Sequence, residues 1–186
     1  YLNFGWAVAI DADGNTVAVT ARNSNTNGRV YVYTRSGSTW ALQQTLAPTK
    51  SNGYFGISVD ISEDGDMITV GHQDAVVGSG PKRTGAVEIF TRSGSTWSSA
   101  QLIEENNNDF PTDAKIGWSN ELASEAKDRL IFGAYSDKSA WVWVNSGGWA
   151  RESELTPSNT PSTQNDSYGY AVSINADGTV AAVSDP

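Results

Sequence analysis

The sequence predicts an all-β protein made of repeated four-stranded antiparallel units. Short apolar runs alternate with Gly, Asp, Asn and Ser along the whole chain, which is typical of strands joined by tight turns. The segment TRSGSTW occurs twice, at 34–40 and 91–97, and an edited copy, NSGGW, ends at Trp149. Each copy follows a run of alternating apolar residues. This pattern predicts a β-hairpin whose loop of three to five residues contains Gly, and its recurrence predicts a repeat architecture.

The first predicted unit spans about 4–46. Large apolar residues alternate with Gly and Ala over 4–10, so we expect a strand that is buried on both faces, in a sheet stacked between neighbouring sheets. The sequence DADG at 11–14 predicts a turn, because Asp and Gly favour turn geometry. Further strands are expected at 16–20, 29–33 and 40–46.

Three more units follow at intervals of about 50 to 60 residues. The second unit, about 55–103, has the same order of elements, with strands expected at 55–61, 67–71, 86–90 and 97–103. The third, about 116–155, lacks the Asp-Gly turn, and its strands are expected at 116–122, 130–134, 141–144 and 149–155. The fourth, 168–186, is incomplete and has two expected strands, at 168–174 and 179–183.

Four-stranded units of this length, repeated around an axis, are the blades of a β-propeller. Residues 1–186 are therefore predicted to form a single propeller region, a partial ring of about three and a half blades. A β-sandwich with Greek-key links is the competing architecture, but sandwiches seldom repeat sequence internally.

The unit starts FGWAVAIDADG, FGISVDISEDG and YGYAVSINADG share the motif FG-x-[SA]-V-x-[IL]-x-x-DG, with Tyr for Phe in the last. IGWSNELASEA matches only at its Gly and apolar positions. This motif resembles the bacterial FG-GAP repeat, which is related to the propeller of integrin α-subunits. The resemblance implies a ring that usually closes with about seven blades. It thus implies a longer polypeptide, the interpretation we favour, or several chains that share one ring.

Composition excludes some partners and some sites. The formal net charge is −9, so neither nucleic acid nor an anionic membrane is an expected partner. No run of residues is apolar enough to span a bilayer. With no cysteine, thiolate metal sites and disulfides are excluded. No cofactor is expected, apart from a possible Ca²⁺.

The calcium hypothesis rests on the first turn of the second unit. The FG-GAP resemblance implies an acidic calcium loop between the first two strands of a blade. Asp60, Ser62 and Asp64, followed by Gly65, reproduce the opening of that loop, although no acid stands at its last ligand position. Calcium requires six to eight oxygen ligands. The alternative interpretation is a tight turn that needs Asp and Gly for backbone reasons alone.

Catalytic residues are hard to find in this sequence. His72 is the only histidine, and we expect it to be a solvated residue in a loop, with Asp74 nearby. The pairs Glu104 with Glu105 and Asp109 with Asp113 could in principle act on glycosidic bonds. They lie in the Asn-rich connector 104–115 and are explained more simply as solubilising charge.

The aromatic residues are expected to be structural. Trp6, Trp118 and Tyr170 share one position in the first strand of their units, in phase with the apolar residues. They are therefore predicted to pack between blades rather than to stack on sugars. The tryptophans that begin the fourth strands are interpreted in the same way: Trp40, Trp97 and Trp149.

The loops indicate where binding would occur. In an up-and-down blade, the turns between strands one and two and between strands three and four share one end, and here these turns are uniform. The loops and connectors at the other end vary, which suits recognition: 72–84, 104–115 and 156–167. The candidate binding residues there are His72, Asp74, Lys82, Arg83, Glu104, Glu105, Asp109 and Asp113.

The function expected from these features is that of a non-enzymatic, extracellular propeller on a cell or virion surface. It would act as a structural, adhesive or receptor- or glycan-binding module. The expected partner is a protein or glycan on a surface, and other copies of the chain or other chains are the candidates for completing the ring. The alternative is a propeller hydrolase or lyase that acts on polysaccharide through acids near the central channel.

Overall fold

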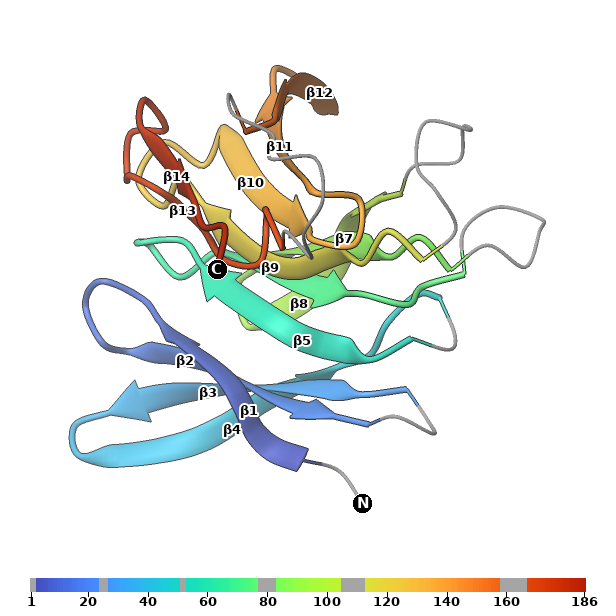
Figure 1. Cartoon of the computed structure of the whole chain (residues 1–186). Coiled ribbons are helices and arrows are strands. Elements are labelled where there is room, and N and C mark those ends of the chain that lie inside the picture. Colours follow the sequence, from blue (N-terminus) through green and yellow to red (C-terminus); the bar gives the residue numbers. More distant parts are fainter. Residues whose placement is uncertain (1–2, 24–26, 51–52, 77–82, 105–112, 158–166) are drawn as a thin grey trace.

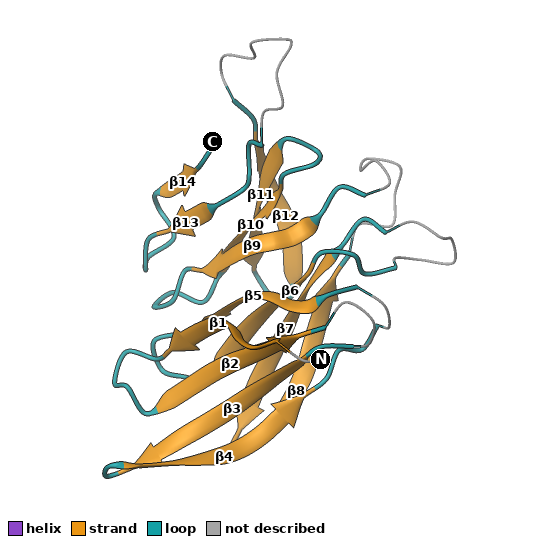
Figure 2. Ribbon diagram, turned by 60° about the horizontal axis from the view of Figure 1, so that its bottom comes forward, coloured by secondary structure: helices purple, strands orange, loops and turns teal. Residues whose placement is uncertain are grey.

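The computed structural model describes residues 3–23, 27–50, 53–76, 83–104, 113–157 and 167–186. The regular structure of these residues is all β, with three four-stranded antiparallel sheets and one two-stranded sheet. The sheets follow one another in chain order and fan out side by side (Figure 1), and strands and loops account for the whole described fold (Figure 2). This arrangement confirms the prediction of a partial β-propeller.

Each complete sheet, or blade, keeps its strands in sequence order. Blade 1 consists of β1 (Asn3–Ile10), β2 (Thr16–Arg22), β3 (Arg29–Ser36) and β4 (Thr39–Leu46). Blade 2 consists of β5 (Phe55–Ile61), β6 (Met67–His72), β7 (Ala86–Ser93) and β8 (Thr96–Ile103). Blade 3 consists of β9 (Ile116–Leu122), β10 (Arg129–Ala134), β11 (Ser139–Asn145) and β12 (Trp149–Leu155).

The fourth unit contributes two short strands, β13 (Val172–Ile174) and β14 (Ala181–Val183), which we call the half-blade. The strand expected at 168–174 is shorter than predicted, because residues 168–171 form a turn and bend. In this turn the N–H of Tyr170 donates to the carbonyl of Ser167 (2.9 Å).

The hairpin formed by TRSGSTW is tighter than the predicted loop of three to five residues. Strand β3 continues to Ser36 and β4 begins at Thr39, so only two residues form the loop. Gly37 has a φ of 61°, and Gly94 in the second copy has a φ of 62°. A positive φ at the first loop position is what a two-residue type II′ turn requires. The copied segment therefore encodes a specific hairpin geometry.

The two kinds of hairpin turn within a blade lie at the same end, as expected. The N–H of Arg35 donates to the carbonyl of Asn15 (2.8 Å), which joins the β3–β4 hairpin to the β1–β2 turn. Arg92 and Asp66 make the equivalent bond in blade 2 (2.9 Å). We call this end the turn end. The opposite end, which we call the loop end, holds the loops between the second and third strands of each blade and the connectors between blades.

Hydrogen bonds also join the turn ends of successive blades. The N–H of Ala12 donates to the carbonyl of Glu63 (3.1 Å), and the N–H of Glu63 donates to the carbonyl of Ser124 (3.2 Å). The N–H of Glu125 continues the series to the carbonyl of Ala176 (3.2 Å). Each blade thus donates to the next one along the chain, and the turn end is a bonded rim.

The glycine of the unit motif allows successive blades to approach closely. A Cβ on Gly117 would lie 2.4 Å from the carbonyl oxygen of Ala86 and 3.1 Å from the Cα of Gly71, both in the preceding blade. Its φ of 77° also favours glycine. Gly5, the motif glycine of blade 1, has nothing within 4 Å of the same position.

Apolar cores fill the space between blades. One core joins Val30, Val32 and Leu46 of blade 1 to Phe55, Ile68 and Val70 of blade 2, among others. A second joins Val87, Ile89 and Ile103 of blade 2 to Ile116, Phe132 and Trp143 of blade 3, among others. A third, smaller core joins Ile131 and Val142 of blade 3 to Ile174 of the half-blade. The stability of the fold therefore resides largely in the contacts between blades.

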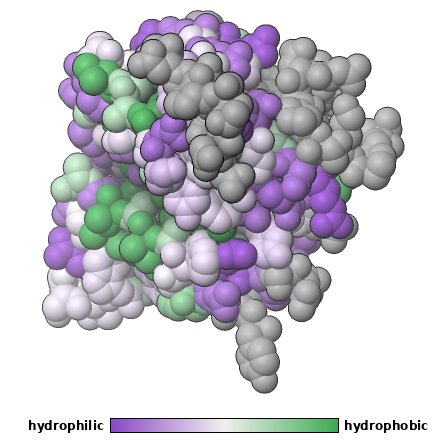
Figure 3. Space-filling view, in the orientation of Figure 1, coloured by the Kyte–Doolittle hydropathy of each residue, from purple (hydrophilic) through white to green (hydrophobic). Residues whose placement is uncertain are grey.

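The prediction that the strand 4–10 is buried on both faces is wrong. Phe4 is 58% exposed and Val8 is 65% exposed, whereas Phe55, the counterpart of Phe4 in blade 2, is fully buried. The physical reason is that no described residue covers this face of blade 1. Figure 3 shows apolar surface gathered on the left of the view, where Figure 1 places the ends of β1 and β5.

Candidate functional site

His72 ends strand β6 and is fully buried, which corrects the prediction of a solvated loop residue. Its ring packs edge-on against Phe55, with the ring centroids 5.7 Å apart. Burial lowers the pKa of His72 to about 4, although the charge of Asp74 acts in the opposite direction. Neither ring nitrogen has a hydrogen-bond partner among the described residues. His72 is therefore a neutral and fully buried residue of the interior.

Lys115 organises the loop end beside His72. Its Nζ lies 2.5 Å from Oδ1 of Asp74, in the loop between β6 and β7. It also lies 2.5 Å from Oδ1 of Asp113, in the connector from blade 2 to blade 3. Burial lowers the pKa of Lys115, but its bonds to Asp113 and Asp74 outweigh burial and hold the pKa above its ordinary value. The lysine is thus a permanent cation that ties a loop to a connector.

The other candidate binding residues have different surroundings. Arg83 is exposed and pairs with Val76 in an isolated antiparallel bridge. Glu104 lies 3.5 Å from the ammonium group of Lys50. Lys82, Glu105 and Asp109 lie outside the residues that the structure describes. Of the eight candidates, the structure brings Asp74 and Asp113 together, and it does so through Lys115, which the sequence analysis did not single out.

Aromatic side chains form a second group at the loop end. Trp118 lies 4.9 Å from Tyr135 and 5.5 Å from Tyr170, and the two tyrosines are 5.8 Å apart, measured between ring centroids. Trp6 donates from Nε1 to the carbonyl of Ile57 in blade 2 (3.1 Å). The predicted contact with a neighbouring blade therefore occurs, but Tyr170 is still 45% exposed.

Asp60, Ser62 and Asp64 do not converge on one point, so their geometry does not support the calcium hypothesis. Asp60 accepts from the N–H of Leu122 in blade 3 (2.8 Å). Ser62 is buried, accepts from the N–H of Met67 (3.0 Å) and donates to Asp64 (2.7 Å). The second oxygen of Asp64 bonds to Lys127 of blade 3. In the described residues, no group of three or more His, Asp or Glu side chains could hold a metal ion.

The same turn position has the same role in other units. Asp11 accepts from the N–H groups of Asn15 and Thr16 (2.8 and 2.9 Å). Asn175 accepts from the N–H of Val180 (2.7 Å), as Ser62 does from Met67. This pattern agrees with the alternative interpretation, in which these polar residues cap a tight turn.

A cavity of about 290 Å³ opens at the turn end of the first strands. Residues of all three blades line it: Ile10, Ala12, Asp60, Ile61, Glu63, Glu121, Leu122 and Ser124. Burial raises the pKa of Asp60 to about 6 against the opposing bonds from Leu122 and Ile61, and the charge of Glu121 adds to the effect. Asp60 is thus a carboxyl group that can exchange a proton near neutral pH, next to a second carboxylate.

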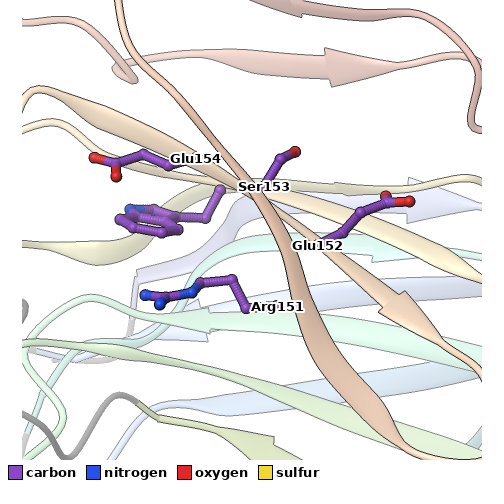
Figure 4. A pocket seen from close by; sticks show the side chains of 5 residues that line it. Arg151, Glu152, Ser153 and Glu154 are labelled. Atoms are coloured by element: carbon purple, nitrogen blue, oxygen red, sulfur yellow. The ribbon is translucent and has the colours of Figure 1, made fainter.

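A larger hollow of about 500 Å³ lies along β12 at the outer side of blade 3 (Figure 4). Its lining includes Trp141, whose ring lies 4.9 Å from the guanidinium of Arg151. The side chain of Glu152 points away from Arg151 and makes two bonds of 3.0 Å to Arg129. Since the charged groups of this hollow do not converge, it is a weaker candidate than the loop end.

The geometry defines a partial β-propeller with a polar and aromatic loop end and a bonded turn end. Solved structures share the fold. One is Sqt1 of Saccharomyces cerevisiae, with a TM-score of 0.58 and 14% identity over 84% of this chain and 36% of that chain. Another is a candidate 6-phosphogluconolactonase of Bacteroides uniformis, with a TM-score of 0.64 and 9% identity over 96% of this chain and 49% of that chain.

The chain thus spans less than half the length of these two structural relatives. No family model matches the chain, and no curated protein matches it either. At such low identity the similarity shows the fold alone. Among the described residues, no helix is long and apolar enough to cross a membrane.

Proposed function

We propose that this chain is part of a non-enzymatic binding propeller, of the FG-GAP type, that recognises its partner through the loop end. The partner is a protein or a glycan displayed on a surface, and the propeller works outside the cell, on a cell surface or a virion. The cluster of Trp118, Tyr135 and Tyr170 beside the Lys115 network supports this proposal, because aromatic faces next to fixed charges suit both protein and sugar partners.

The two ends of the blades support the assignment of roles. The turn end is a rim of short turns joined by backbone hydrogen bonds, so changes there would disturb the scaffold. The loop end has longer loops, and some of its residues are exposed, such as Arg83 and Tyr170. Recognition residues are commonly carried by loops that a rigid scaffold positions.

The test compares matched variants on arrays of glycans and of surface proteins. We expect the chain to bind, and we expect Tyr135→Ala to weaken binding about tenfold or more, because an aromatic contact at the centre of a site is worth roughly 2 kcal/mol. Val180→Ala at the turn end, where Val180 is 64% exposed, is the control and should bind as the parent does. Equal binding by the parent and Tyr135→Ala would contradict the proposal.

A second candidate function follows from the cavity that contains Asp60. A carboxyl group with a pKa of about 6 beside Glu121 resembles the acid and base pairs of enzymes that cleave glycosidic bonds. A polysaccharide hydrolase or lyase is therefore the alternative. Turnover of polysaccharides that is lost in both Asp60→Asn and Glu121→Gln would establish it and exclude the non-enzymatic proposal.

A further inference from the structure

One face of blade 1 is apolar and uncovered. This face, which we call the leading face, has exposed apolar side chains from the first and fourth strands: Phe4, Val8, Ile10, Trp40 and Leu42. Ile10 is 57% exposed, whereas its counterpart in blade 2, Ile61, is 4% exposed. Trp40 is 42% exposed and its counterpart Trp97 only 3%. An apolar surface of this extent indicates an interaction site.

Blades 2 and 3 each have an equivalent leading face, and in both the preceding blade covers it. The leading face of blade 2 packs against the opposite face of blade 1, through Val30, Val32 and Leu46. The leading face of blade 3 packs in the same way against Val87, Ile89 and Ile103 of blade 2. In both junctions an aliphatic sheet face of the preceding blade covers an aromatic-rich leading face.

A glutamine bridge accompanies both junctions. The side-chain amide of Gln44 in blade 1 donates to the carbonyl of Trp97 and accepts from its N–H, at 2.8 Å each. Gln101 of blade 2 makes the same two bonds to Trp149, at 3.3 Å each. The two glutamines share a register, because Gln44 pairs with Val32 and Gln101 with Ile89 in their own blades. The bridge is therefore common to the two junctions between complete blades.

In blade 1, the backbone groups that would bond to a preceding blade are present, but no described blade lies against them. Trp40 stands at the register of Trp97, since it pairs with Arg35 as Trp97 pairs with Arg92. At the turn end, the carbonyl of Glu63 accepts from the preceding blade, and Ala12 is the residue of blade 1 at that position. No described side chain bonds to the backbone of Trp40.

We propose that the leading face of blade 1 binds a further β-blade of the same kind, whose fourth strand carries a glutamine that bridges to the backbone of Trp40. The occupant presents aliphatic residues at the positions of Val30, Val32 and Leu46. A second copy packed face to face is a poorer fit, because it would oppose two aromatic faces and bring no glutamine to Trp40. The proposal rests on the fold and is independent of what the loop end binds.

The experiment extends the chain by the blade that this proposal describes. A copy of residues 1–54 is joined directly to Phe4, so that the copied connector enters β1 as the native connector enters β5. Hydrogen exchange is then followed at the amide of the native Trp40. We expect exchange to slow about tenfold or more relative to the unextended chain, because the amide gains a buried bond. The extended chain should remain a monomer in sedimentation.

Variants of the added copy isolate the bridge. Gln44→Ala in the copy should make exchange at the native Trp40 about tenfold faster again, because the bridge is lost. Thr45→Ala in the copy, a neighbouring exposed substitution, should leave this exchange rate unchanged. Exchange at Trp97 in the same samples reports whether the native blades are folded.

Two results would overturn the proposal. In one, the Trp40 amide exchanges as fast as in the unextended chain while Trp97 stays protected, so the face does not order a blade. In the other, the unextended chain sediments as a dimer in which Trp40 is already protected, which would assign the face to a second copy of this chain.

Discussion

Gln44 bonds to both backbone groups of Trp97, donating to the carbonyl and accepting from the N–H, with donor and acceptor 2.8 Å apart in each bond. A side chain of one sheet thereby reproduces the pair of bonds that two strands exchange within a sheet. Because Trp97 is almost completely buried, its backbone would have no water to replace this partner.

Replacing Gln44 with Ala should lower the free energy of unfolding by about 1–3 kcal/mol, since two buried backbone groups lose their partner. Gln101→Ala is the matched comparison. Its bonds to Trp149 are longer, at 3.3 Å, so we expect a smaller loss. Denaturant unfolding of both variants measures the difference, and a larger loss for Gln101→Ala would contradict this reasoning.

Gly117→Ala should be among the most damaging single changes, with a loss of more than about 3 kcal/mol. The new Cβ would lie 2.4 Å from the carbonyl oxygen of Ala86, and the φ of 77° is unfavourable to alanine. Gly5→Ala is the control, because Gly5 has a similar φ of 81° but nothing within 4 Å. It should cost only the backbone term of about 1–2 kcal/mol. Thermal or denaturant unfolding should separate the two, and equal losses would argue against close approach as the cause.

His72 should destabilise the protein as the pH falls. Its pKa in the folded state is about 4, below the ordinary value of 6.5, so between these two values the unfolded chain binds a proton that the folded chain does not. The free energy of unfolding therefore falls by up to about 3 kcal/mol from pH 6.5 to pH 4 through this group. His72→Ala, which places at 72 the residue found at the equivalent positions 21 and 134, should lose this dependence.

Asp60 should act in the opposite direction. Its pKa in the folded state is about 6, above the ordinary 3.8, so the folded chain holds a proton that the unfolded chain has lost. Its contribution is complete below about pH 4 and is lost as the pH rises to 6, a change of about 3 kcal/mol. Between pH 4 and pH 6, the free energy of unfolding of Asp60→Asn should therefore rise more steeply with pH than that of the parent, as measured by denaturant unfolding at several pH values. An unchanged slope would show that Asp60 ionises normally.

Calcium should have no effect on stability. The side chains of Asp60, Ser62 and Asp64 are each engaged by different partners, and one of these is the ammonium group of Lys127. A ligand that binds only the folded state must raise its melting temperature. We expect melting curves with calcium and with a chelator to coincide, and a higher midpoint with calcium would restore the metal site.

The sequence allowed the blade plan to be predicted because strand periodicity and turn chemistry are local. The repeated TRSGSTW located two hairpins, and the Asp-Gly turns located the turn end. Burial was harder to predict. The first strand of blade 1 has the same alternation as that of blade 2, but Phe4 is exposed and Phe55 is buried, since burial depends on a neighbouring blade.

The candidate site was predicted only in part, because its members come together through contacts between distant segments. Lys115 meets Asp74 across a separation of 41 residues, and no local pattern reports that contact. The burial of His72 had a usable signal, since alignment of the units places it at the strand position that holds Ala21 and Ala134. The calcium spacing did not reveal that Asp60, in a strand, accepts a bond from blade 3.

Ser153 stands in blade 3 at the register of Gln44 and Gln101, since it pairs with Val142 as they pair with Val32 and Ile89. A serine is too short to make the two-bond bridge. In a chain of units that each touch only their neighbours, stability is set junction by junction. Local unfolding should therefore start at the half-blade and proceed toward blade 1. Proteolysis and hydrogen exchange under native conditions should then affect the half-blade first and blade 1 last.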